Sequence, residues 1–583
     1  GDRVALRNKD YGLWQEESWN DYRDKVRAVA NALLALGVAP EECVALISEN
    51  RPEWVYADLG VQSTGAITAA IYVTSAAEQV AYIVKHSGAS LIFVEDEEQL
   101  DKILSTREQL PELKRIVVFD WKGLRDFSDP MVMRFEDFLE LGKKADAAAE
   151  EALDKRIAGL SPDATALLVY TSGTTGPPKG AMLSHHNLMT TGRMLNEVNP
   201  IFEGDDALSF LPLCHIAERM MTVVNQLLFG YTVSFAESLD TVPQDLREVS
   251  PTVLFAVPRI WEKFYSRILL TMREAELSKR LAYSAAVRVG KKAARVREEG
   301  RQPGLMLAAL NRLAHMSVFH PLKKRLGLER TRLAISGAAP ISPEILRYFH
   351  AIGLDLREVY GQTEGSGPTS IHRGKDIRIG TVGPPLPGVE VEIADDGEIL
   401  VKGDNVFQGY HRSPEATAET IVDGYLHSGD LGEFDNDGYL KITGRKKDLI
   451  ITGGGKNVAP QNIENQLKFS PYINDAVVIG DNRPFLSALI LIDEENVTDY
   501  AQENRIPFTT YADLTRNPEI FKLLESEVQK VNGQLARVEQ VRKFVVLDRR
   551  LEEEDGEVTP TMKVKRMNIE KMYADVIEGM YRR

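Results

Sequence analysis

The spacing of apolar residues in the first part of the chain predicts alternating helices and strands. Residues 21–36 place apolar side chains three and four positions apart before Gly37, a pattern typical of an amphipathic helix and its C-cap. Further helices are predicted at 53–72 and 76–86. Short apolar runs between polar residues predict buried parallel strands at 43–48, 90–94, 115–120 and 252–257. Such alternation indicates a doubly wound α/β sheet.

Residues 270–332 have a different pattern, helical and basic. Residues 278–302 contain eight Lys or Arg and two Glu, and 305–322 add Leu, Met and Phe at helical spacing. Two interpretations stay open for this region. It is either a solvated helical hairpin or a cationic amphipathic surface that contacts an anionic membrane.

After Gly380 short strands and tight turns dominate. Residues 389–401 alternate around an Asp-Asp-Gly turn, which predicts a β-hairpin, and short strands are expected at 438–442 and 449–451. Helices are predicted at 462–468 and 521–541. A domain boundary is expected at 444–448, where a glycine is followed by three cations, so that residues 1–446 form a large domain and 447–583 a small one.

Composition narrows the class of protein. The chain has 583 residues, a net charge of −16, and 43% hydrophobic and 27% charged residues, which is ordinary for a soluble protein. The negative charge argues against a nucleic-acid partner. Two cysteines, Cys43 and Cys214, cannot build a disulfide framework and fit a reducing compartment, so a cytoplasmic location is expected.

Residues 170–180, YTSGTTGPPKG, are the most informative segment. Three glycines, two prolines and four Ser or Thr hydroxyls follow a predicted buried strand. Such a loop can direct backbone N–H groups and hydroxyls at one anion, with Lys179 adding positive charge. It is not the nucleotide-hydrolysing P-loop, which needs Gly-Lys-Ser/Thr opening a helix.

Four later segments carry further polar groups suited to a nucleotide. In VYGQTEG (359–365), Tyr360 offers a face for stacking on a base and Glu364 an oxygen ligand for Mg²⁺. SGAAP (336–340) is a small-residue turn that would let a flat ring lie against backbone. In HSGDL (427–431), Asp430 can accept hydrogen bonds from two sugar hydroxyls. TGRKKDLIITGGGKNVAP (443–460) places a cation near a bare glycine run, and TPTMKVKR (559–566) is a basic segment near the C-terminus.

In this order and at these separations, the motifs resemble the adenylate-forming superfamily of acyl-CoA synthetases, luciferases and peptide-synthetase adenylation domains. The likeness extends over essentially the whole chain. LPLCHIAER (211–219), VPRIWEK (257–263), GGGKNVAP, PTMKVKR and an extra helical segment near 496–521 make it most similar to bacterial long-chain fatty-acid–CoA ligases. The resemblance implies multi-layered α/β sheets and a small distorted β-barrel in the large domain, and a mobile α+β small domain.

The resemblance also assigns substrates and roles. It implies that a carboxylic acid reacts with ATP and Mg²⁺ to give an acyl-adenylate, and that the acyl group then passes to coenzyme A. It places the β- and γ-phosphates on Thr171, Ser172, Gly173, Thr174, Thr175, Gly176 and Lys179, and adenine between Gly337, Ala338 and Ala339 and the Tyr360-Gly361 turn. Thr363 contacts the phosphoryl group, Glu364 binds Mg²⁺, Asp430 takes the ribose hydroxyls, and Arg445 orients the ribose or phosphate.

Further residues are assigned by the same resemblance. Lys563 is expected to be the catalytic lysine; because Met562 stands where the superfamily usually has Gly, Lys565 stays the alternative. Lys447 falls at the hinge, and Gly453, Gly454 and Gly455 line a coenzyme A tunnel. His215 and Val257 belong to the acyl pocket and its gate, although a structural role for His215 is equally consistent. The cysteines are expected to be core residues.

Two other functions compete with this interpretation. One is a fatty-acyl-AMP ligase that loads a carrier protein; an insertion near the hinge usually marks that group, and residues 429–453 contain no obvious one. The other is a non-catalytic acyl-nucleotide-binding or membrane-docked module. Membrane contact through residues 270–332, at the inner face of the membrane, is compatible with the basic pattern there.

Overall fold

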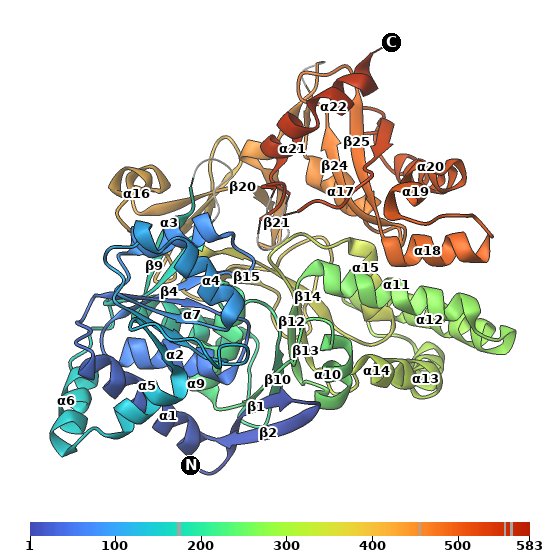
Figure 1. Ribbon diagram of the computed structural model, residues 1–583. Coiled ribbons are helices and arrows are strands. Elements are labelled where there is room, and N and C mark those ends of the chain that lie inside the picture. Colours follow the sequence, from blue (N-terminus) through green and yellow to red (C-terminus); the bar gives the residue numbers. More distant parts are fainter. Residues whose placement is uncertain (172–176, 454–455, 553–554, 560–563, 583) are drawn as a thin grey trace.

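The computed structural model describes residues 1–171, 177–453, 456–552, 555–559 and 564–582. Two large sheets and a smaller antiparallel sheet make up the first part of the chain, and the C-terminal part (orange to red in Figure 1) lies at one end of them. The fold is the expected combination of multi-layered α/β sheets and a smaller α+β part. Within the described residues, no helix combines the length and the apolar character that a transmembrane span needs.

The first sheet has the strand order β15-β14-β13-β12-β10-β11-β1-β2. Its core from β14 to β1 is parallel, and β15 and β2 add antiparallel edges. The strands are β1 (Val4–Asp10), β2 (Leu13–Ser18), β10 (Asp206–Ser209), β11 (Thr232–Phe235), β12 (Val253–Ala256), β13 (Leu333–Ser336), β14 (Leu356–Gln362) and β15 (Gly367–Ile371).

The second sheet has the order β18-β9-β8-β4-β3-β5-β6-β7 and is parallel from β8 to β7. Its strands are β3 (Cys43–Ile47), β4 (Ile67–Ile71), β5 (Leu91–Val94), β6 (Arg115–Val118), β7 (Val132–Arg134), β8 (Thr165–Thr171), β9 (Lys179–Ser184) and β18 (Gly409–Tyr410). In this sheet β3, β4 and β5 are buried throughout, as expected for strands with helices on both faces.

Helices cover these sheets and fill the connections between strands (Figure 1). They are α1 (Trp19–Ala35), α2 (Pro52–Ser63), α3 (Ala77–Ser87), α4 (Glu97–Ser105), η1 (Arg107–Gln109), α5 (Phe135–Lys143), α6 (Ala147–Ala158), α7 (His185–Val198), α8 (Ile216–Arg219), η2 (Met220–Val224), α9 (Asn225–Phe229), α10 (Val242–Val249), α11 (Pro258–Glu274), α12 (Leu277–Glu298), α13 (Leu305–Ala314), η3 (His315–Phe319), α14 (His320–Leu326), α15 (Pro343–Ala351) and η4 (Thr363–Gly365).

The later part of the chain builds smaller sheets. The predicted hairpin forms as β16 (Glu390–Ile393) and β17 (Glu398–Lys402), joined by β19 (Ile421–Val422), β20 (Tyr425–Phe434) and β21 (Leu440–Arg445). After η5 (Lys446–Asp448) come β22 (Ile450–Ile451), β23 (Asn457–Val458), β24 (Ile473–Ile479), β25 (Leu486–Ile492) and β26 (Val541–Val546). The remaining helices are α16 (Pro414–Thr420), α17 (Pro460–Leu467), α18 (Glu494–Glu503), α19 (Tyr511–Arg516), α20 (Pro518–Asn532), α21 (Arg566–Met572) and α22 (Ala574–Tyr581).

Two of the predicted helices were too long. The helix expected at 53–72 ends at Ser63, because Gly65 adopts a positive φ of 77°, and Ile67–Ile71 then forms β4 in the middle of the second sheet. The helix expected at 521–541 ends at Asn532. There the Asn532 side chain exchanges two hydrogen bonds of 2.9 Å with the backbone of Val541, where β26 begins.

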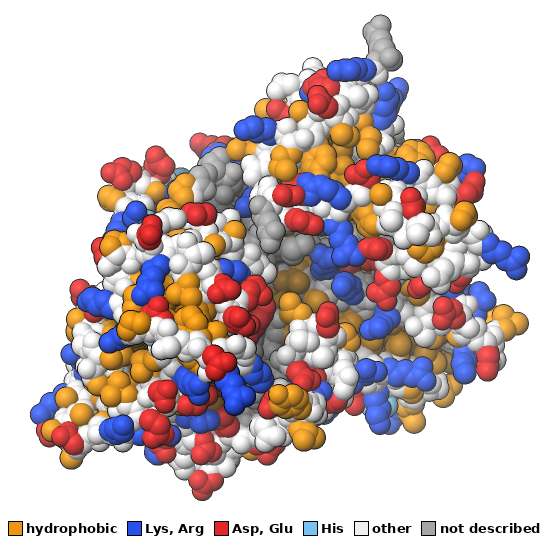
Figure 2. Space-filling view, in the orientation of Figure 1, with side chains coloured by type: hydrophobic (Ala, Val, Ile, Leu, Met, Phe, Trp, Pro, Cys, Tyr) orange, Lys and Arg blue, Asp and Glu red, His pale blue; other side chains and the backbone are white. Residues whose placement is uncertain are grey.

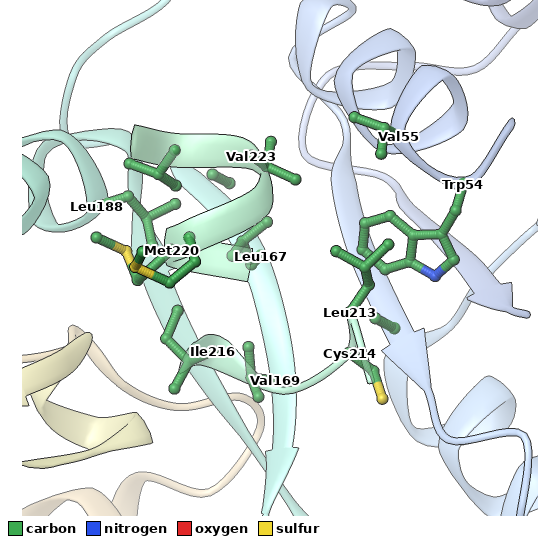
Figure 3. Close-up of a cluster of buried hydrophobic side chains, with 14 of the residues drawn as sticks. Trp54, Val55, Leu167, Val169, Leu188, Leu213, Cys214, Ile216, Met220 and Val223 are labelled. Carbon is green, nitrogen blue, oxygen red and sulfur yellow. The ribbon is translucent and has the colours of Figure 1, made fainter. Parts of the chain in front are cut away.

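A buried ion pair links α2 to α8 inside the core. Arg219 donates a hydrogen bond to Asp58, both side chains are at most 1% exposed, and the guanidinium carbon lies 4.8 Å from the centre of the Trp54 ring. Figure 3 shows the surrounding apolar cluster, in which Ile216 and Met220 face β8. Removing one partner of such a pair leaves an uncompensated buried charge, which is strongly destabilising.

We therefore expect Asp58→Ala to lower the free energy of unfolding by about 3–5 kcal/mol. Urea unfolding followed by tryptophan fluorescence measures this. The matched control is Asp24→Ala, because Asp24 pairs with Arg23 at 2.7 Å with both side chains more than 60% exposed; it should change stability by less than about 1 kcal/mol. Equal unfolding midpoints for the two variants would contradict the prediction.

Candidate functional site

The predicted anion loop connects two strands of the second sheet. β8 ends at Thr171, β9 begins at Lys179, and these two residues are antiparallel partners. The strands therefore fix both ends of the loop at the same edge of the sheet. The loop residues themselves, Ser172, Gly173, Thr174, Thr175 and Gly176, lie outside the described residues.

Glu364 joins the two sheets beside this loop. It lies in η4, directly after β14 of the first sheet, and its carboxylate accepts a 2.8 Å hydrogen bond from the hydroxyl of Tyr410 in β18 of the second sheet. The Thr171 hydroxyl donates to the same oxygen at 3.4 Å. The Lys179 ammonium lies 5.2 Å from the centre of the Tyr410 ring. A carboxylate and an ammonium group are thus both held against one tyrosine.

A second group of side chains surrounds Asp430. Its carboxylate accepts one hydrogen bond of 2.9 Å from the Tyr360 hydroxyl and another of 2.9 Å from Nε of Arg445. Burial, and then the nearby Asp430 carboxylate, raise the pKa of Tyr360 well above its usual value, so the hydroxyl stays a donor. Tyr360, Asp430 and Arg445 come from three different strands, and the structure brings them together.

The small-residue turn lies next to Tyr360. Residues Gly337, Ala338 and Ala339 follow β13, and Ala338 has a positive φ of 69°. A side chain on Gly337 would come within 2.5 Å of Val359, and one on Gly361 within 1.8 Å of the Gly367 carbonyl oxygen. These positions therefore require glycine, because neighbouring protein atoms already fill the space that a side chain would need.

The expected acyl-gate residues both lie at the N-terminal ends of helices. His215 caps α8, where its Nδ1 accepts a 3.2 Å hydrogen bond from the N–H of Ala217. Val257 caps α11 directly after β12, whose Ala256 is paired with Ser336, the residue before Gly337. The cap supports the structural interpretation of His215 and leaves its gating role a prediction.

The C-terminal positions are only partly described. Lys447 lies in η5, and Gly453 donates a 2.9 Å hydrogen bond to the Arg483 carbonyl. Gly454, Gly455 and Lys563 fall outside the described residues. Lys565 caps α21, and its backbone N–H bonds the Glu557 carbonyl at 2.8 Å.

Comparison with known proteins identifies the family. The model of the AMP-binding enzyme family matches residues 1–411, and that of the AMP-binding enzyme C-terminal domain matches residues 447–583. The chain belongs to the AMP-binding enzymes. It is 35% identical over 573 residues to the long-chain-fatty-acid–CoA ligase FadD15 of Mycobacterium bovis, with 98% of this chain and 93% of the relative covered.

Other similar proteins agree with this family. The long-chain-fatty-acid–CoA ligase ACSBG1 of Homo sapiens is 33% identical over 613 residues, with 100% of this chain and 83% of the relative covered. Among solved structures, the AMP complex of the A-PCP didomain of a carboxylic acid reductase from Segniliparus rugosus gives a TM-score of 0.75 at 21% identity, covering 100% of this chain and 80% of that one. The anthranilate CoA ligase AuaEII with anthranoyl-AMP gives 0.73 at 21% identity, covering 99% and 95%. Both structures show the shared fold.

The side chains fit the groups that an AMP-binding enzyme handles. A buried carboxylate at Asp430 suits hydroxyl donors, and the glycine-bounded turn beside Tyr360 suits a planar ring. In the described part of the chain, no group of three or more His, Cys, Asp or Glu side chains could hold a metal by itself. Glu364 alone, beside the predicted anion loop, still fits Mg²⁺, which binds through one or two carboxylates and completes its shell with phosphates and water.

Two residues of the site are absent from the sequence interpretation. Tyr410 contacts both Glu364 and Lys179, yet it lies in a Gly-Tyr dipeptide with no charged or repeated pattern to mark it. Glu358, two residues before Tyr360, accepts a weak 3.5 Å hydrogen bond from the Ile341 N–H, and burial raises its pKa to about 8. The sequence signal that could have identified Glu358 is its position directly before the VYGQTE motif.

We expect Tyr410→Phe to weaken Mg²⁺-dependent ATP use while the fold is retained. The substitution removes the hydrogen bond that orients Glu364 but keeps the ring beside Lys179. Because a hydrogen bond to a charged group contributes about 1.5–3 kcal/mol, the Mg²⁺ concentration for half-maximal ATP–pyrophosphate exchange should rise about tenfold or more. Tyr425→Phe, which removes a hydroxyl bonded to the exposed Glu390 and Glu392, is the matched control. An unchanged Mg²⁺ titration would remove Tyr410 from this role.

Proposed function

We propose that this AMP-binding enzyme is a long-chain fatty-acid–CoA ligase. It would activate the acid as acyl-AMP with release of pyrophosphate, and then transfer the acyl group to coenzyme A with release of AMP. The observation that carries the proposal is that β14 and η4 position two groups of polar side chains: Glu364 shares Tyr410 with Lys179, and Tyr360 bonds Asp430 of the smaller sheet. Full-length similarity to relatives named long-chain-fatty-acid–CoA ligases supports the choice of acid and acceptor.

The first half-reaction is attack of a carboxylate on the α-phosphorus of ATP. Two anions must approach, so catalysis depends on neutralising and positioning charge. We assign the β- and γ-phosphates to the 171–179 loop with Lys179, and Mg²⁺ to Glu364. Thr363 would contact the phosphoryl group, Tyr360 and the 337–339 turn would hold adenine, and Asp430 would accept from the ribose hydroxyls. Bound Mg²⁺ would neutralise phosphate charge.

The second half-reaction needs no protein nucleophile, because acyl-AMP is already activated and the thiol of coenzyme A is nucleophilic. Both cysteines are buried, and burial raises the pKa of each thiol. We propose that residues 447–583 form a mobile domain that turns about Lys447. One orientation would present Lys563 for adenylation, and the other would present Gly453–455 as a coenzyme A passage.

We expect Lys563→Ala to lose about 10²-fold or more in ATP–pyrophosphate exchange, by analogy with removal of one transition-state hydrogen-bond donor. Thioester formation from supplied acyl-AMP should be spared. Lys565→Ala is the matched control and should keep exchange activity. If the two variants behave in the opposite way, Lys565 is the catalytic lysine; if neither loses exchange, the lysine assignment is wrong.

The same assay identifies the acceptor. Wild-type protein with Mg²⁺, ATP, palmitate and coenzyme A should yield acyl-CoA and AMP. Acyl-AMP that accumulates without acyl-CoA would favour the carrier-loading enzyme instead. Absence of both products would overturn the proposed function, and a scan of acid lengths would give the chain-length preference.

We expect Lys447→Pro to slow thioester formation far more than adenylation. Proline fixes φ near −65° and so restricts rotation at the hinge. Single-turnover measurements of the two half-reactions test this. Lys447→Ala is the control and should retain both steps, because alanine does not fix φ. An equal loss of both half-reactions in Lys447→Pro would argue against a hinge at this residue.

For its location, we propose the cytoplasm, with peripheral contact at the inner face of the membrane. The low cysteine content and the substrate class support the compartment. The basic helices of residues 270–332 support the membrane contact.

A further inference from the structure

Exposed apolar side chains gather on one helical hairpin. We name residues 277–316 the basic hairpin; it contains α12, α13 and the start of η3. Of 21 exposed large hydrophobic residues in the described chain, seven lie within these 40 residues. They are Leu277, Leu281, Leu305, Met306, Leu310, Leu313 and Met316, exposed by 43–93%. Scattered apolar residues are normal at a surface, whereas such a concentration marks an interaction site.

The packing of α12 fixes which side faces outward. Ala286, Gly290 and Ala293 recur at helical spacing and are buried. A side chain on Gly290 would come within 2.2 Å of the Ala351 carbonyl oxygen, so this face lies directly against α15. The small residues of α12 therefore pack on the protein, and the opposite face of this helix is exposed.

The outer face of α12 combines leucines with cations. Leu277, Leu281, Arg288, Lys292 and Arg295 follow one another at spacings of 4, 7, 4 and 3 residues, which places them on one side of a helix, and all five are exposed. Figure 2 shows blue and orange side chains next to each other on the right-hand side, where these helices lie in Figure 1.

The local charge is opposite to that of the whole chain. Residues 278–302 carry eight Lys or Arg and two Glu, within a chain of net charge −16. Cations concentrated beside exposed leucine and methionine are typical of helices that lie in the plane of a membrane interface. Anionic lipids attract each nearby Lys or Arg, and apolar side chains enter the headgroup region.

We propose that the basic hairpin docks this enzyme on the surface of an anionic lipid bilayer. A second copy of the chain fits less well, because an isologous contact would place the same cationic face against itself. A nucleic acid would use the cations but would leave the leucine and methionine side chains in water. The docking itself does not depend on the proposed function, but its purpose does: a long-chain acid resides in the bilayer from which the enzyme would take it.

Vesicle sedimentation of the full chain tests the proposal without ATP, acid or coenzyme A. Wild-type protein should bind phosphatidylglycerol-containing vesicles and not pure phosphatidylcholine vesicles, and binding should weaken from 50 to 500 mM salt. Arg288→Gln/Lys292→Gln/Arg295→Gln should lower the affinity by about 100-fold, as expected for three cations near an anionic surface. Leu305→Ser/Met306→Ser/Leu313→Ser should lower it by about tenfold or more.

Matched controls remove similar side chains elsewhere. Arg23→Gln/Lys143→Gln/Lys155→Gln neutralises three exposed cations, and Leu239→Ser removes an exposed leucine; both should bind vesicles as the wild type does. All hairpin variants should keep wild-type ATP–pyrophosphate exchange with a short, water-soluble acid that the enzyme accepts. Failure of the wild type to bind anionic vesicles, unchanged binding by the hairpin variants, or a dimer in solution that these variants dissociate would overturn the proposal. Vesicle binding without exchange activity would instead contradict only the proposed function.

Discussion

The carboxylate of Glu364 ties the two large sheets together at the candidate site. It extends from the end of β14 in the first sheet, and its partners Tyr410 and Thr171 belong to the second. The Glu364 carbonyl also accepts a 2.8 Å hydrogen bond from the Phe407 N–H, just before β18. Main-chain and side-chain bonds thus hold one residue between the sheets, so that residues more than 190 positions apart in the chain meet within hydrogen-bond distance.

The Asp430 group connects this site to the C-terminal part. Arg445 bonds Asp430, the proposed ribose acceptor, and lies two residues before Lys447, so one short segment links that residue to the proposed hinge. Beyond the hinge, α11 contacts the C-terminal part directly: Arg259 donates to the Asn474 side chain at 2.9 Å, and Tyr265 stacks on Phe469 with centroids 5.3 Å apart. Turning about Lys447 would have to break both these polar and these aromatic contacts.

Most of the fold could be predicted from the sequence, because local patterns determine it. The prediction was wrong where contacts between distant segments determine the structure. The helix at Trp19–Ala35 follows from its own periodicity and the Ser18–Asp21 capping box. Residues 67–71 were assigned to a helix because their apolar run continues that of α2; only their place between β3 and β8 makes them a strand. In the site, charged motif residues were recognisable, whereas Tyr410 acts through neighbours that the fold brings to it from other segments.

Charge distribution places a further constraint on this family member. ATP, coenzyme A and a fatty carboxylate are all anions, yet the chain carries a net charge of −16, so the overall field opposes their approach. Affinity must therefore arise from cations and dipoles held close to the substrates, and Lys179, which lies over the Tyr410 ring, is a cation that we propose for this role. The acidic surface repels anions in general. Only an anion that also fits the shape of the site gains enough from the local cations to bind, so recognition is selective.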